Sequence, residues 1–182
     1  PELDAQQARW ETQTLADIAA ATSSMEPATL GPWWRSEPLP PTSAGAEAMF
    51  ATAFAPEQQQ QTIDTDNGWH QDDSLVDGAP HGFASGTYTT YLHRTIVAAT
   101  ARRMHLTLGS DDAIKVFCNG ELVLQNNTRR GVQPDQEQLQ IQLRAGTNTL
   151  LIKIVNYGGA GGMYFQSVAE TVTDLPSDAL QA

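Results

Sequence analysis

The chain has 182 residues, 40% of them hydrophobic, which is enough for one folded domain with additional segments. Its formal net charge of −11 argues against nucleic acid as a partner, because phosphates would be repelled and no basic stripe offsets the charge. No run of about 18 apolar residues occurs, so we expect neither a membrane span nor a secretory signal.

The N-terminal region, residues 1–29, is expected to be a helical lead-in. It is rich in helix-forming residues, and its first residue, Pro1, stands in the first turn, where proline is tolerated. Its apolar residues make only a loose stripe, so we expect it to pack on the edge of a neighbour. Because the chain begins with proline, we read it as a piece of a longer protein.

Three segments without regular strands are expected next. Prolines in residues 30–45 forbid a helix and favour a linker or a wrapped arm. Residues 47–63 are predicted to form one short helical turn followed by an extended segment. Residues 64–86 are dense in Asp, Asn, Gly and Ser, which is typical of long surface loops.

From residue 87 onward the sequence predicts short strands with alternating apolar residues. They are residues 87–98, 101–110, 113–119, 121–126, 137–146, 148–156 and 162–170. Asn119-Gly120 predicts a type I′ hairpin turn, which needs positive φ at both central positions. Residues 148–156 are apolar on both faces, as expected for a central strand. With no helices between the strands, the pattern predicts an antiparallel β-sandwich.

Cys118 is the only cysteine of the chain. A single cysteine excludes an internal disulfide, a zinc site built from thiolates and a CxxCH haem attachment. Its place in an alternating strand predicts a small buried hydrophobic residue instead of a nucleophile.

Two stretches, "LTLGSDDAIKVFCNGELVLQNNTRRG" and "PDQEQLQIQLRAGTNTLLIKIVNYGGAGGMYF", resemble the galactose-binding-like jelly-roll domains of planctomycete-type multidomain cytochrome c proteins. The resemblance covers residues 30–168 and implies an all-β, antiparallel jelly-roll sandwich of carbohydrate-binding ancestry. Residues 1–29 and 169–182, the latter a helical stub, would then connect to neighbouring domains. The resemblance also implies an extracytoplasmic bacterial parent, periplasmic or secreted, but no haem, because CxxCH is absent.

Candidate ligand-binding residues are aromatic and polar. Sugar rings stack on aromatic side chains while amides and guanidiniums bind the hydroxyls, and a guanidinium can also bind a carboxylate or sulfate. The aromatic candidates are Trp33, Trp34, Trp69, Tyr157 and Tyr164, and the polar candidates are Asn126, Asn127, Arg129, Arg130 and Asn156. The alternative for the tryptophans is a place in the core, and for the polar residues an ordinary solvated loop.

Asp111 and Asp112 are candidate calcium ligands, with Asn156 or Asn126 completing the set. The pair resembles an Asp-Asp step of protective-antigen-type adhesin domains, in which a calcium ion contacts sugar hydroxyls. The alternative is that the two aspartates accept hydrogen bonds from their own backbone and shape a turn. The acidic tract from Asp64 does not fit an EF-hand loop, which needs glycine at its sixth position and glutamate at its twelfth. Counted from Asp64, glycine is fifth and leucine is twelfth.

No enzyme is expected, because the sequence has no GxSxG elbow, no Cys-His context and no phosphate loop. We expect a non-catalytic carbohydrate-binding accessory domain whose partner is a polysaccharide or glycan. The alternatives are a structural spacer that docks neighbouring domains of the parent chain and a calcium-dependent lectin, and calcium is the only cofactor considered. A binder should expose a Trp or Tyr beside Asn, Arg or Asp, whereas a spacer should bury its tryptophans.

Overall fold

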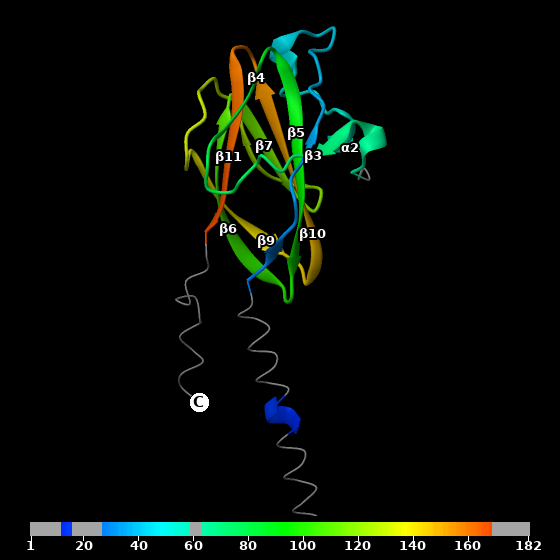
Figure 1. The fold of residues 1–182 in the computed structure, drawn as a ribbon, viewed down its shortest axis with the longest axis vertical. Coiled ribbons are helices and arrows are strands. Elements are labelled where there is room, and N and C mark those ends of the chain that lie inside the picture. The colour runs from blue at the N-terminus through cyan, green and yellow to red at the C-terminus, as the bar shows by residue number, and fades with distance from the viewer. Residues whose placement is uncertain (1–11, 16–26, 59–62, 169–182) are drawn as a thin grey trace, which may run out of the picture.

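The computed structural model describes residues 12–15, 27–58 and 63–168 (Figure 1). Two antiparallel sheets pack face to face, which confirms the predicted all-β jelly-roll sandwich. Residues 12–15 are helical. The rest of the predicted N-terminal helix and the predicted C-terminal stub lie outside the described residues. Within the described ranges no helix is long and apolar enough to cross a membrane.

The larger sheet has seven strands in the order β3-β2-β5-β10-β7-β8, and β1 also pairs with β5. These strands are β1 (Thr29–Leu30), β2 (Trp34–Ser36), β3 (Trp69–Gln71), β5 (Tyr88–Ala98), β7 (Ala113–Cys118), β8 (Glu121–Asn126) and β10 (Gly146–Asn156). The smaller sheet has the order β4-β11-β6-β9. Its strands are β4 (His81–Ser85), β6 (Arg102–Asp111), β9 (Glu137–Leu143) and β11 (Ala160–Val168). Three short helices are η1 (Ala46–Ala48), α2 (Ala55–Gln58) and η2 (Thr65–Asn67).

The predicted C-terminal strands are confirmed, from β5 to β11. Asn119 and Gly120 have φ of 52° and 81°, as the predicted type I′ turn requires. The predicted central strand is β10, which pairs with β5 on one side and β7 on the other. Cys118 is 5% exposed in the core, as its alternating strand predicted.

The upstream half differs from the prediction of a linker and long loops. Residues 30–45 contribute β2, and residues 64–86 contribute β3 and β4. The reason is length: β2 and β3 have three residues each, too few to show alternation, and they are held by pairing to β5 and to each other. Within residues 47–63, the predicted helical turn is present as α2.

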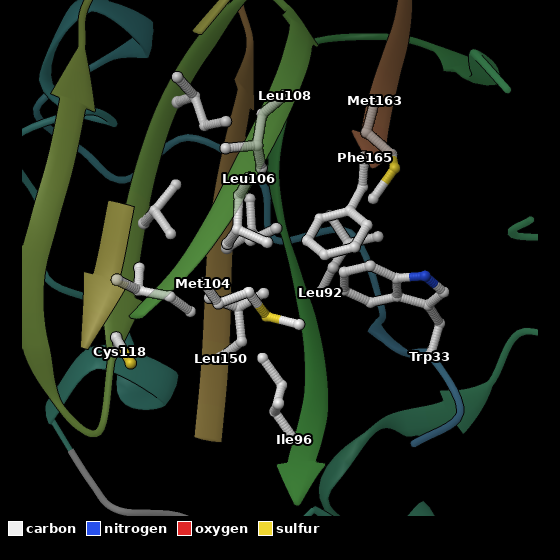
Figure 2. Packing of buried hydrophobic residues seen from close by; sticks show 14 of the residues in the cluster. Trp33, Leu92, Ile96, Met104, Leu106, Leu108, Cys118, Leu150, Met163 and Phe165 are labelled. Atoms are coloured by element: carbon white, nitrogen blue, oxygen red, sulfur yellow. The ribbon is translucent and has the colours of Figure 1, made fainter. Parts of the chain in front are cut away.

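The core lies between the two sheets and is filled by apolar side chains from both (Figure 2). Trp33 packs edge-on against Phe165 with 5.1 Å between ring centroids, and Leu92, Leu106 and Leu108 belong to the same cluster. Because these side chains fill the interior, any ligand must meet the rims or the outer faces of the sandwich.

Residues 46–58, here called the arm, lie on the outer face of the larger sheet (Figure 1). Lys153 of β10 has 0% side-chain exposure, and its Nζ donates to Glu57 Oε1 at 2.6 Å and Thr52 O at 2.6 Å. The Tyr91 hydroxyl also donates to Glu57. A buried ion pair with its own hydrogen bonds therefore fastens the arm to the sheet.

Candidate functional site

Three chain segments meet at one edge of the sandwich, here called the corner. They are the β6–β7 junction at Asp111-Asp112, the β8–β9 loop of residues 127–136, and the β10–β11 turn beginning at Tyr157. Asp112 joins them: its Oδ1 accepts from the Arg130 amide at 2.9 Å, and its Oδ2 accepts from the Tyr157 amide at 2.8 Å. Asp112 therefore shapes the corner, and it does so through amides 18 and 45 residues away in the chain instead of through its own backbone.

Asp111 lies beside Asp112 without a partner of its own. Its carboxylate makes no hydrogen bond and no ion pair with any described residue. Burial raises the pKa of Asp111, and the negative charge of Asp112 raises it further. The corner thus holds one engaged carboxylate and one that is half-buried and free.

Arg130 orders the loop from inside. Its NH2 donates to Ser110 Oγ at 2.8 Å, and its NH1 lies 2.8 Å from Glu137 Oε1. The Asn126 side chain donates to the same Glu137 oxygen at 2.7 Å. Both polar candidates are therefore committed to contacts within the protein, and their role is to hold the β8–β9 loop.

Tyr157, Asn127 and Arg129 form the outer surface of the corner. The Tyr157 hydroxyl donates to Asn127 Oδ1 at 2.7 Å, and the Arg129 guanidinium lies 4.4 Å from the Tyr157 ring centroid. Arg129 also pairs with Glu47 of the arm, and these two side chains are 59% and 80% exposed. Burial raises the pKa of Tyr157, so its hydroxyl stays a donor at neutral pH.

Asn156 lies below this surface and is fully buried. Its Nδ2 donates to Gly86 O at 2.9 Å and to Gly159 O at 3.0 Å, which shapes the β10–β11 turn. The side-chain amides of the two asparagines expected to complete a calcium site, Asn156 or Asn126, donate to Gly86 O and Gly159 O and to Glu137, respectively. Among the described residues no group of three or more His, Cys, Asp or Glu side chains is arranged to hold a metal.

The remaining aromatic candidates lie away from the corner or beneath the surface. Trp33, Trp69 and Tyr164 are 4%, 2% and 7% exposed, so their rings are covered by the protein. Trp34 is half-buried on β2. Trp34 was expected in a linker or wrapped arm and Trp69 in a surface loop; they lie on strands instead, because β2 and β3 pair with each other and join the larger sheet.

Sequence reasoning missed Glu47 as a member of the corner. The arm carries Glu47 to Arg129, which is 82 residues away in the chain, so no spacing pattern links the two. Of the predicted candidates, the structure brings together both aspartates, Tyr157 and the polar residues 126–130. This grouping follows from the pairing of β10 with β7, which aligns Val155 with Ala113.

No protein-family model matches the sequence, and no curated protein matches it significantly. Among solved structures, the chain is similar to the PA14 domain of the MpAFP antifreeze protein, with 9% identity over 81% of this chain and 86% of that domain, and a TM-score of 0.42. It is similar to a PA14 sugar-binding domain from an RTX adhesin, with 18% identity over 44% of this chain and 46% of that one, and a TM-score of 0.35.

A family 35 carbohydrate-binding module from Clostridium thermocellum is also similar, with 12% identity over 53% of this chain and 85% of that module, and a TM-score of 0.37. The aligned region spans less than half of the adhesin chain. Two of these three neighbours are thus carbohydrate-binding domains by description. Their likeness to this chain is a partial one of fold, and the residues of the corner define its chemistry.

Proposed function

We propose that this domain is a non-catalytic carbohydrate-binding accessory domain and that glycan binds at the corner. The observation that carries the proposal is the outer surface of the corner, where Tyr157, Asn127 and Arg129 present an aromatic ring, an amide and a guanidinium together. These are the three chemical groups with which proteins hold sugar rings and their hydroxyls.

Each of the three groups has a distinct part in binding. The exposed amide of Asn127 and the guanidinium of Arg129 donate hydrogen bonds to sugar hydroxyls, and the half-buried ring of Tyr157 packs against C–H groups. The Tyr157 ring also packs against the buried cluster of Met49, Ala113 and Val155, and Arg129 lies over the ring, so only part of it is open to a ligand. We therefore expect affinities in the range of about micromolar to millimolar.

A non-catalytic role is supported by the acids of the corner. Asp111 and Asp112 are adjacent in the chain, and both oxygens of Asp112 already accept backbone amides. Hydrolysis of a glycosidic bond needs two carboxyl groups on opposite sides of that bond. We also propose, from the sequence resemblance, that the parent protein is extracytoplasmic and has further domains.

Tyr157→Ala is expected to weaken binding of the preferred glycan about tenfold, since it removes the ring and releases Arg129 and Asn127. Arg129→Gln should have a similar effect. A glycan array identifies the ligand, and titration calorimetry measures its affinity. Arg103→Gln is the matched control, because Arg103 is exposed on β6, away from the corner. Unchanged affinity in both corner variants, with wild-type stability, would contradict the proposal.

A calcium-dependent form of this binding is a second candidate. The favouring observation is the free carboxylate of Asp111 beside Asp112. If calcium binds there, millimolar calcium should raise the melting temperature of the wild-type protein but not of Asp111→Asn, and a chelator should abolish glycan binding. Binding that survives the chelator assigns recognition to Tyr157 and Arg129 alone.

Without calcium, Asp111→Asn is expected to stabilise the protein at pH 7 by less than about 1 kcal/mol, because solvent screens a half-buried pair. The pKa of Asp111 is raised in the folded state, so ionisation of this group costs stability above that pKa. The cost disappears as the pH falls through the raised pKa toward the ordinary value of about 3.9. Urea denaturation between pH 7 and 4 should show that the stability difference between Asp111→Asn and wild type shrinks as the pH falls. A difference that stays constant with pH would have another cause than the Asp111 charge.

A structural spacer is the third candidate, favoured by the burial of Trp33 and Trp69 and by the exposed apolar side chains of Leu122 and Val123 on edge strand β8. A glycan array separates it from the binder. If no glycan is retained while deletion of the domain lowers the activity of the parent protein, the spacer replaces the binder.

A further inference from the structure

A surface hollow lies on the outer face of the larger sheet, away from the three segments that make the corner. Its volume is about 430 Å³, within the usual range of ligand sites. The floor is a cross-strand row, because His93 of β5 is paired with Leu151 of β10, and Leu151 with Phe117 of β7. Side chains at paired positions share one face of a sheet, so these three lie side by side.

The floor of the hollow is apolar and aromatic. Leu151 and Phe117 are each only half-buried, although they belong to strands in the middle of the sheet. Trp69 lies at the same hollow and packs edge-on against His93, with 6.3 Å between ring centroids. The floor therefore offers a flat apolar surface with one imidazole, of the kind that the C–H face of a sugar ring contacts.

The arm reaches one end of the hollow through Glu57. Its carboxylate lies against Lys153, two residues from Leu151 along β10, and Pro56 and Gln58 of the arm also line the hollow. The ion pair compensates the charge of Glu57. This end of the hollow thus presents polar atoms without a net charge.

The opposite end of the hollow is positive. Arg144, which follows β9, lines the hollow together with the exposed Thr149. The Arg144 guanidinium makes no hydrogen bond and no ion pair with any described residue. His93 adds no charge, because burial lowers the pKa of its imidazole and keeps the ring neutral. Arg144 is thus an uncompensated cation beside an apolar floor, in a chain of net charge −11.

We propose that this hollow is a second ligand site, which binds a sugar residue carrying an oxyanion, either a carboxylate or a sulfate. The ring lies on Leu151 and Phe117, and the oxyanion pairs with the guanidinium of Arg144. The site shares only its ligand class with the proposed function, since no residue of the corner lines it. The acidic remainder of the protein repels anions generally, so Arg144 and the floor must act together to retain one.

The test uses three disaccharides: digalacturonic acid, a monosulfated digalactose, and unmodified digalactose. Wild-type protein should bind at least one of the anionic forms about tenfold more tightly than the neutral form. Arg144→Gln should remove that preference by lowering the affinity for the anionic form. Phe117→Ala should weaken binding of the anionic ligand about tenfold. If the alanine variant unfolds, Phe117→Leu, which keeps an apolar floor, is measured in its place. The anionic disaccharide that binds shows whether the oxyanion is a carboxylate or a sulfate.

Two control variants locate the binding. Arg103→Gln makes the same charge change on the other sheet and should leave all affinities unchanged. Arg129→Gln changes the corner alone and should leave the preference for an anionic ligand in place. Loss of that preference in Arg129→Gln but not in Arg144→Gln overturns the second site while supporting the corner. Equal binding of neutral and anionic sugars, or binding of none, overturns the second site. The glycan array then tests separately whether the corner binds a glycan.

Discussion

Lys153→Met is expected to lower the free energy of unfolding by about 3–5 kcal/mol. The substitution removes the cation that neutralises Glu57, and both side chains are almost completely buried, with exposed fractions of 0% and 7%. It also leaves the Phe50 and Thr52 carbonyls without their charged donor. Breaking one side of a buried pair costs far more than removing the whole pair, because the remaining charge stays desolvated. Urea denaturation at pH 7 measures the loss.

A second variant separates the charge from the packing. Lys153→Met combined with Glu57→Gln should recover at least about 1 kcal/mol relative to Lys153→Met, since no buried charge remains and the Tyr91 hydroxyl keeps an acceptor. Lys115→Met is the matched control, because Lys115 is half-buried on β7, at the position paired with Lys153, and its ammonium lies over the ring of Phe50. It should cost less than about 1 kcal/mol. A similar cost for both lysines would show that the Glu57 pair is not what fastens the arm.

Arg94→Met is expected to cost about 2–4 kcal/mol. The Arg94 guanidinium is 6% exposed, pairs with Asp77 at 2.7 Å, and donates to Gly31 O at 2.7 Å. It also lies 4.4 Å from the ring of Trp33. Methionine keeps an apolar contact with that ring, but it leaves the Gly31 carbonyl without its charged donor and Asp77 with the indole N–H of Trp33 and no cation. Denaturation in urea reports the loss.

A double-mutant cycle with Asp77→Asn isolates the pair. We expect a coupling of at least about 1 kcal/mol, because the two side chains share one partly buried network with Trp33. Arg103→Met, at an exposed position on β6, should change stability by less than about 0.5 kcal/mol. Additive effects of the Arg94 and Asp77 substitutions would assign the loss in Arg94→Met to packing and to the hydrogen bonds with Gly31 O.

Both buried cations serve the same structural purpose. Lys153 holds the arm on the outer face of the larger sheet, and Arg94 holds the segment at Gly31 and the loop at Asp77 against the core. The arm in turn supplies Glu47 to the corner and Glu57 to the hollow. Loss of the Lys153 anchor is therefore expected to disturb ligand contacts as well as stability.

The strands from β5 to β11 could be predicted because each is long enough to show its pattern. In β6, Met104, Leu106 and Leu108 face the core while His105 and Thr107 face outward, and this alternation is visible in the sequence. Asn119-Gly120 predicted its turn, because few residue pairs accept positive φ at both positions.

The polar candidates of the corner could be found one motif at a time, but their roles could not. Arg129 and Arg130 are neighbours of the same type, yet Arg130 is held by Ser110 and Glu137 while Arg129 stays exposed over Tyr157. The direction of a side chain from a loop depends on the backbone of that loop, which Asp112 orders through the Arg130 amide. No local pattern encodes this choice.

By itself, the sequence determined what depends on neighbours in the chain: the alternation of the longer strands, the tight hairpin turn, the apolar central strand, and hence the layered antiparallel class of the fold. Only the tertiary structure decided which charges are buried, which tryptophans are covered, and which side chains meet at the corner and the hollow. Lys153 and Glu57 are 96 residues apart, and Arg94 and Gly31 are 63 apart. Such contacts depend on strand order and register, which arise when the whole core packs and which no short window of residues contains.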